Sequence, residues 1–434
     1  MTTSAPAAAA GPAAPAPAAP LWRSRNFLLL WGGQTVGELG ARISGVAVPL
    51  LAATTLHASV FQISLLSFLG WLPYLLFSLP AGILADRVDQ RKLMIVCDLA
   101  RMALMLSLPL AALLWELRLW YLYLVVGVCG VFTVLFNVAY KSMLPRLAGP
   151  DRLVDANAKI VMSQEFAELI GPTVSGLLIG LVGTARTFFS NGLAFLVSAV
   201  TLALLREAPR PAAAEASDGG GRAGLRAEMS EGLAFIRSRP ILLAILACTA
   251  TSNFFVIAKS SIEVTFLVRE LHASSLAVGL VFSVSAVGGL AVGAVASRLS
   301  RRIGTARIIW VAMAVPGPLY ALMPLATPGW GLLTYGFGLA AFSANVGLYN
   351  IAATSYQQQV TPAHLLGRVN AAFMWICLGV IPIGALFGGA LGSGLGLRTT
   401  LWICVLGTWS AALFVVFSPL RTMRDMPAEG TSSP

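Results

Sequence analysis

Three polar side chains in the first long apolar stretch have the types and spacing for proton chemistry. Gln34, Glu38 and Arg42 follow one another at intervals of four residues, so a helix would carry them on one face. At about 1.5 Å per residue from Phe27, Glu38 lies about 16 Å along the helix, near the middle of a bilayer. If Glu38 and Arg42 pair, protonation of Glu38 frees Arg42, which would act as a proton switch. The other interpretation is a permanent structural pair.

A second acidic group lies in a later apolar stretch. Glu165 and Glu168 are three residues apart, roughly 7 and 12 Å along a helix that begins at Ile160. Two neighbouring carboxylates favour the uptake of a proton or the binding of a cationic substrate. The alternative is that they form structural pairs with Arg101 or Lys141 on neighbouring helices.

Other polar residues also interrupt the apolar stretches. Asn137 and Asn345 are uncharged, and are expected to line a cavity or to bond between helices. Two pairs have the spacing of helical ion pairs and are interpreted as mainly structural: Asp98 with Arg101, and Lys259 with Glu263, whose lysine is expected to extend to the outer interface.

The composition requires a lipid environment for these residues. Of the 434 residues, 57% are hydrophobic and 11% are charged, and the mean hydropathy is +0.81. Soluble domains carry about 25% charged residues, so this is a membrane protein, and soluble enzymes and nucleic-acid binders are excluded. The five cysteines and three histidines have no spacing that suits a metal. The sequence also has no phosphate-binding loop, so ATP is not expected to drive the protein.

Apolar runs long enough to cross a bilayer predict an all-α membrane protein with twelve transmembrane helices. The connections between them are short, except for one at 206–239. The predicted spans are 27–54, 60–84, 93–114, 119–140, 160–183, 187–205, 241–267, 276–296, 306–325, 330–350, 371–392 and 399–418.

The distribution of lysine and arginine predicts the orientation. With the N-terminus inside, 22 of these residues fall in the inner segments, four in the outer segments and three within spans. Because positively charged loops remain in the cytoplasm, both termini are expected to be cytoplasmic. The same distribution accounts for the net charge of +11 without any nucleic-acid partner.

Short repeated motifs divide the chain into two copies of a six-helix unit. The sequence LHAS occurs at Leu56–Ser59 and again at Leu271–Ser274, 215 residues later. A G-x-x-A-[DS]-R pattern begins at Gly82 and at Gly293, 211 residues apart, and an asparagine pair recurs at an offset of 213. Three loops with nearly equal offsets predict a 6+6 duplication.

The predicted domains follow from this duplication. A disordered tail is expected at one end, a cytoplasmic linker with a surface helix at 223–237 in the middle, and a short cytoplasmic tail at the other end. The boundaries are 1–22 for the tail, 23–205 for the N-terminal half, 206–239 for the linker, 240–418 for the C-terminal half and 419–434 for the final tail.

Over about residues 22–420 the sequence resembles the major facilitator superfamily. The resemblance rests on the twelve spans, the duplication, the long central loop and "GILADRVDQRK" at Gly82–Lys92. Within the superfamily the chain is similar to the macrolide-efflux and enterobactin-exporter type of drug:proton antiporter. The segments that carry this similarity are "GELGARIS" in span 1, "DLAR" in span 3, "EGLAFIRSRP" before span 7 and "LLGRVNA" before span 11.

The resemblance implies a conformational latch in the first of these loops. In the family, residues that match Gly82, Asp86, Arg87 and Arg91 hold the two halves together on the cytoplasmic side. The alternative is that the basic residues only fix the topology. The sequence departs from the family pattern at Asp89, where glycine is usual, and the next residue is a glutamine where a basic residue is usual.

The resemblance also extends to the antiporter signature of the fifth span. Gly171, Pro172 and Gly176 keep part of that pattern, and small residues beside a proline favour a close, bent helix crossing. The family often has an acidic residue where this chain has Ala41, so a coupling role does not transfer there directly.

These features together predict a secondary active transporter of the bacterial cytoplasmic (inner) membrane. It is expected to export small amphipathic or apolar compounds by proton antiport and alternating access. It is not an enzyme and needs no cofactor. Its partners are a small-molecule substrate, protons and the lipid bilayer, with no nucleic acid, and it acts as a monomer. One alternative is a siderophore or lysolipid carrier. An alternative of another class is a non-transporting membrane receptor or assembly factor.

Overall fold

The computed structural model describes residues 21–114, 116–149, 152–206, 222–362 and 364–425, and within these ranges every regular element is helical. The first half contains η1 (Leu21–Arg23), α1 (Arg25–Thr54), α2 (Val60–Arg87), α3 (Gln90–Leu114), α4 (Leu119–Ala148), α5 (Leu153–Val182) and α6 (Thr184–Ala203). The rest contains α7 (Arg222–Ser238), α8 (Pro240–Arg269), α9 (Ser275–Ile303), α10 (Arg307–Ala314), α11 (Gly317–Tyr320), α12 (Gly331–Val360), α13 (Leu366–Gly394), α14 (Leu397–Ser410), α15 (Ala412–Val416) and η3 (Pro419–Arg421).

Eleven helical segments of the described chain are long and apolar enough to cross a membrane. The predicted span 306–325 is not among them, because it is divided into α10 and α11. The break falls at Pro316, and Pro318 follows within two residues. Proline has no backbone N–H and its ring collides with the preceding turn, so two prolines this close together weaken the helix where it is interrupted. The count of twelve spans therefore stays a prediction.

The two LHAS segments form the same turn in both halves. His57 and His272 have φ angles of 48° and 50°, in the left-handed region that ends helices. The serine that follows each histidine by two residues caps the next helix: Ser59 accepts from the backbone N–H of Gln62, and Ser274 does the same for α9. The repeated sequence is thus a compact helix stop followed by a helix start.

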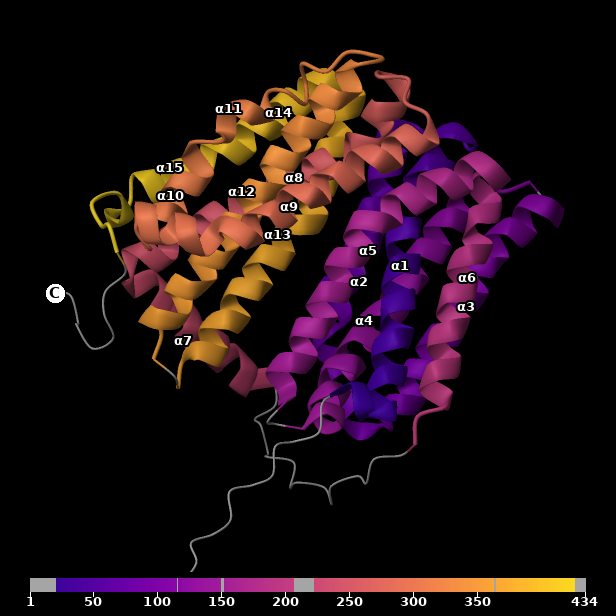
Figure 1. The fold of residues 1–434 in the computed structure, drawn as a ribbon, viewed down its shortest axis with the longest axis horizontal. Coiled ribbons are helices and arrows are strands. Elements are labelled where there is room, and N and C mark those ends of the chain that lie inside the picture. The colour runs from indigo at the N-terminus through magenta and orange to yellow at the C-terminus, as the bar shows by residue number, and fades with distance from the viewer. Residues whose placement is uncertain (1–20, 115, 150–151, 207–221, 363, 426–434) are drawn as a thin grey trace, which may run out of the picture.

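The long helices alternate in direction, so the structure has two ends. We call the end where α1 begins and α15 finishes the terminal face, and the opposite end the far face. Helices α1–α6 form one half, and α8–α15 form the other (Figure 1). The halves meet mainly where α5 packs against α9 and α2 packs against α13.

The hydrophobic clusters show that the halves join at the far face and separate toward the terminal face. The far-face cluster of the second half includes Val46 of α1, and the far-face cluster of the first half includes Val264 of α8. Among the described residues, each of the two terminal-face clusters contains residues of one half only. One cluster is formed by residues between 21 and 205, and the other by residues between 235 and 423. Figure 1 shows the corresponding divergence of the two sets of helices.

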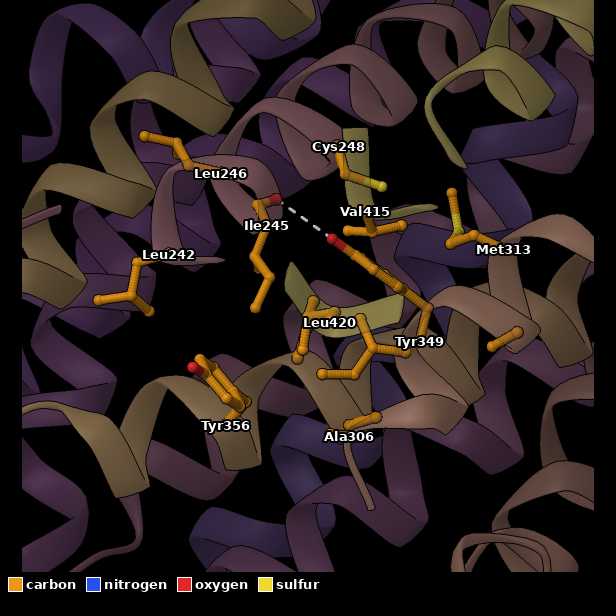
Figure 2. Packing of buried hydrophobic residues seen from close by; sticks show 14 of the residues in the cluster. Leu242, Ile245, Leu246, Cys248, Ala306, Met313, Tyr349, Tyr356, Val415 and Leu420 are labelled. Atoms are coloured by element: carbon orange, nitrogen blue, oxygen red, sulfur yellow. Dashed lines mark hydrogen bonds between the residues drawn. The ribbon is translucent and has the colours of Figure 1, made fainter. Parts of the chain in front are cut away.

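The terminal-face cluster of the second half is a core of buried, mainly apolar side chains (Figure 2). Tyr349 of α12 reaches α8, and its hydroxyl donates to the carbonyl oxygen of Ile245 at 3.1 Å. Cys248 of α8, Met313 of α10 and Val415 of α15 lie around the ring in Figure 2. This packing makes α8, α10, α12 and α15 one rigid unit.

Helix α7 occupies the segment where a surface helix is predicted. Glu231 forms an ion pair with Arg368 at the beginning of α13, with an N–O distance of 2.5 Å. Gly232 lies against the backbone of Arg368, where a side chain would not fit. The helix is therefore attached to the second half. The predicted tails fall largely outside the described residues, but Leu21 is fully buried, so the folded part begins before the predicted boundary at residue 22.

Candidate functional site

A cavity of about 770 Å³ lies between the halves, and most of its wall belongs to the first half. Its size suits a drug-sized molecule. The second half contributes Ser260, Ser261, Val264 and Phe282. Ser261 lies where the halves touch, because its hydroxyl is 3.4 Å from that of Ser64. The cavity is therefore closed at the end where the two halves meet.

Glu38 of α1 lies on the cavity wall and is partly buried. Its hydrogen bond among the described residues comes from the side-chain amide of Gln34, at 3.0 Å from Nε2 to Oε1. No lysine or arginine forms an ion pair with it in the described part of the chain. Glu38 thus brings an unbalanced negative charge to the cavity.

Arg42 forms its ion pair with Glu168 of α5 rather than with Glu38. The reason is the close packing of α5 on α1 at Gly171, where an added Cβ would collide with the Arg42 side chain. Glu168 lies one turn before Gly171 on α5, within reach of the guanidinium group. The structure pairs Arg42 differently from the sequence expectation. Five of the seven residues predicted for the cavity nevertheless line it: Gln34, Glu38, Arg42, Asn137 and Glu168.

Asp98 and Arg101 of α3 form an ion pair on the same cavity wall. The Arg101 guanidinium carbon lies 4.3 Å from the centre of the Phe136 ring and 4.5 Å from that of Phe195. Asp98 is fully buried, and the Arg101 side chain is 8% exposed. The interpretation as a pair is correct, but the pair belongs to the cavity.

Uncharged polar groups complete this wall. Asn137 lines the cavity and donates through Nδ2 to the Tyr74 hydroxyl at 3.0 Å. Asn191 of α6 is buried on the same wall and contacts the Ser44 hydroxyl of α1. These uncharged amides and hydroxyls can form hydrogen bonds with polar atoms of a bound molecule without adding a charge to the cavity wall.

Two of the predicted site residues lie elsewhere. Glu165 is exposed on α5 and does not contribute to the wall of this cavity. Asn345 is buried inside the second half, where its Nδ2 donates to the Tyr320 hydroxyl. Their roles in coupling or substrate binding remain predictions.

The first-half loop predicted to be a latch forms its bonds within the first half in this conformation. Arg91 donates to the carbonyl oxygens of Leu202 and Ala203 at the end of α6, at 2.9 and 2.5 Å. Asp89 accepts from the backbone N–H groups at the beginning of α3, which explains how an aspartate serves in this turn. Gly82 and Arg87 lie in α2, and the Asp86 side chain is outside the described part.

Glycines close the far face by letting helices touch through their backbones. An added Cβ on Gly176 of α5 would collide with the Ser275 carbonyl oxygen of α9, and one on Gly279 of α9 would collide with the Pro172 carbonyl oxygen. Thr173 and Ser283 add a hydroxyl contact of 2.7 Å beside them. Pro172 and Gly176 of the signature therefore lie at the junction of the two halves, whereas Gly171 packs against Arg42 within the first half.

A second charged cluster is buried away from the cavity. Lys259 Nζ is 2.6 Å from Glu263 Oε2, and the Tyr335 hydroxyl donates to Glu263 Oε1 at 2.7 Å. The lysine and glutamate side chains are 5% and 3% exposed. The expectation that Lys259 extends to the membrane interface is wrong, because Glu263 and the Phe342 ring hold it inside.

Sequence reasoning missed several residues of the cavity wall. The sequence predicts Asp98 and Arg101 near the inner end of the span 93–114, as a structural pair, whereas in the structure both residues of α3 line the cavity. Asn191 is a polar residue within an apolar span, and that signal was available. Tyr74 and the two α8 serines carry no comparable signal, because their types are common in packed helices.

Comparison with known proteins identifies relatives of this arrangement. Residues 30–383 match the family model described as Major Facilitator Superfamily. The chain is 29% identical over 398 residues to YfiS, an uncharacterised MFS-type transporter of Bacillus subtilis, covering 89% of this chain and 91% of the relative. It is 22% identical over 410 residues to macrolide efflux protein A of Streptococcus pyogenes, covering 93% and 98%.

A third relative and a solved structure agree with these matches. The enterobactin exporter EntS of Salmonella choleraesuis is 26% identical over 399 residues, covering 88% of this chain and 90% of the relative. The crystal structure of a bacterial homolog of the human lysosomal transporter Spinster, in an inward-facing and unoccupied conformation, has a TM-score of 0.71 at 16% identity, covering 91% and 96%. The sequence matches confirm the resemblance found in the motifs, and the structural match shows the same fold.

Proposed function

Since the chain belongs to the Major Facilitator Superfamily, we propose that it exports small amphipathic or apolar compounds in exchange for protons. Its relatives are transporters rather than enzymes, and they include named efflux proteins. The observation that carries the proposal is the unbalanced carboxylate of Glu38. A proton and a cationic group of the substrate can both neutralise this charge, and only one of them can do so at a time.

The other charges of the cavity are already balanced. Glu168 is paired with Arg42, and Asp98 is paired with Arg101. With Glu38 ionised, the wall carries one net negative charge, and with Glu38 protonated it carries none. Uncompensated charges at this depth are costly in a membrane. This supports a cycle in which a positively charged amphipathic compound binds while Glu38 is ionised and is released when Glu38 becomes protonated.

Alternating access supplies the other half of the mechanism. With twelve passes and both termini in the cytoplasm, as the arginine distribution predicts, the terminal face is cytoplasmic and the structure is open inward. The Gly82–Lys92 loop is then proposed to close the cytoplasmic side in the opposite state, through Gly82, Asp86, Arg87 and Arg91. The efflux relatives support outward transport across the cytoplasmic membrane. The cycle needs no cofactor, since the proton gradient supplies its free energy, and a single chain forms the whole cavity, which supports a monomer.

The Glu38→Gln variant tests the proposal. We expect gradient-driven uptake of a fluorescent lipophilic cation into everted membrane vesicles to fall at least tenfold, equivalent to about 1.4 kcal/mol. Glutamine keeps the size and the hydrogen-bonding capacity of the side chain but cannot bind or release a proton. Uptake is measured with and without a proton gradient in wild-type and variant vesicles.

A matched control is Glu116→Gln, since that carboxylate is exposed beside Arg118 and does not line the cavity. It should keep wild-type uptake. Gradient-driven uptake that persists in Glu38→Gln would contradict coupling at Glu38 and direct attention to Glu165 or Glu168. No uptake by wild type would contradict a broad efflux role and favour the siderophore, lysolipid-carrier or receptor alternatives.

A further inference from the structure

We propose that the free edge of the Arg101 guanidinium group is a second contact point for the exported compound, and that it binds a neutral carbonyl oxygen. This inference rests on the proposed function, because it concerns a compound that enters the same cavity. It gives the Asp98–Arg101 pair of α3 a role in substrate selectivity, which is separate from the proposed role of Glu38 in proton exchange.

The geometry fixes the orientation of this guanidinium group. Phe136 of α4 and Phe195 of α6 both contact it, and its Nη2 donates a hydrogen bond to Asp98. Cation–π contacts and an ion pair together remove most of the conformational freedom of an arginine side chain. A donor held in this way loses little entropy when it binds a ligand.

The remaining nitrogens of Arg101 have no partner in the described part of the chain. Nε is enclosed without a hydrogen bond, as is Asn191 Oδ1 on the same wall, whereas Nη1 is unpaired but not enclosed. A buried polar atom without a partner destabilises the protein, because it has lost its hydrogen bonds to water. Native proteins hold few of them, and each needs an explanation. Because Arg101 lines the cavity and its Nη1 is neither paired nor enclosed, a molecule in the cavity can supply the missing partner of Nη1.

The charge of the wall decides which group this molecule presents. Asp98 already balances Arg101, so a carboxylate or phosphate would add an unbalanced negative charge beside Glu38. A carbonyl oxygen accepts the same hydrogen bond without that charge. The ring faces are covered by the guanidinium group, so they do not serve as a stacking surface for the ligand. The preferred compound therefore combines a cationic group for Glu38 with a carbonyl group for Arg101.

Two matched probes test this inference. The (4-oxo-4-phenylbutyl)triphenylphosphonium ion carries a ketone, and the (4-phenylbutyl)triphenylphosphonium ion has a methylene group in its place. The dissociation constant of each is measured by titration calorimetry on the purified full chain in detergent, with titration into detergent alone subtracted. We expect the wild type to bind the ketone about tenfold more tightly, equivalent to about 1.4 kcal/mol.

The variants assign this preference to Arg101. Arg101→Lys keeps a cation beside Asp98 but has no further nitrogen that could donate to a ligand, so the two probes should bind it about equally. Arg186→Lys, at an exposed arginine in the first turn of α6, should keep the wild-type preference. Binding of the methylene probe shows that each variant is folded. The double variant Asp98→Asn/Arg101→Gln provides a second test without a buried charge.

Each outcome separates this inference from the proposed function. Equal binding of the two probes by wild type would overturn the carbonyl contact and indicate that water satisfies Arg101, while the proposed function would stand. A ketone preference that survives in both Arg101 variants would also overturn it. Failure of wild type to bind either cation would overturn the proposed substrate class, and the carbonyl contact with it.

Discussion

Replacement of Gly279 with leucine is expected to reduce transport by more than tenfold. A Cβ at this position would collide with the carbonyl oxygen of Pro172 and lie 3.1 Å from the Cα atom of Thr173. These are backbone atoms of α5 and cannot rotate aside, so α5 and α9 must separate. Overpacking of this kind costs about 1–3 kcal/mol, and it acts on the conformation that is closed at the far face. The variant should therefore favour the conformation that is open at the far face, and it should no longer complete the transport cycle.

The measurement combines vesicle transport with the accessibility of the far face. A cysteine at Ser283, which contacts Thr173 across the interface, should react faster with a membrane-impermeant thiol reagent when Gly279→Leu is present. The control is Gly180→Leu, because Gly180 is exposed one turn beyond Gly176 and an added Cβ there meets no atom within 4 Å. Wild-type transport and labelling in Gly279→Leu would mean that another contact closes the far face.

The sequence predicts the helical class and most of the helices, because apolar length and loop motifs are local properties. The LHAS turn is an example: a residue in the left-handed region, followed by a capping serine, ends one helix and begins another in both halves. The broken segment at Pro316 shows the limit of this reasoning. Hydropathy alone scores it as a span, but the helix is interrupted beside Pro316 and Pro318, which both lack a backbone N–H.

The pairing of charges in the site could not be predicted from spacing. Glu38 and Arg42 lie one helical turn apart and are able to pair, yet Arg42 pairs with Glu168 because Gly171 lets α5 approach α1. That choice depends on a contact between residues far apart in the sequence. Asn345 shows the same limitation, since an asparagine in a span reads equally well as a cavity residue and as a partner for a buried tyrosine such as Tyr320.

Replacement of Lys259 with methionine is expected to lower the free energy of unfolding by about 3–5 kcal/mol. The lysine and Glu263 are almost completely buried, and the carboxylate accepts hydrogen bonds from both Lys259 and Tyr335. Without the ammonium group, an uncompensated negative charge remains among the apolar side chains of α8 and α12. The effect is measured as thermal unfolding of the purified protein at a fixed detergent concentration.

Two further variants separate the buried charge from the loss of a side chain. Lys259→Met/Glu263→Gln should recover much of the stability, because a neutral amide oxygen still accepts from Tyr335. Lys92→Met removes a lysine that is 79% exposed and 3.9 Å from Asp89, and should change stability by at most about 1 kcal/mol. If Lys259→Met is as stable as Lys92→Met, the loss of the Lys259 ammonium group does not leave a destabilising charge on Glu263, and the prediction is wrong.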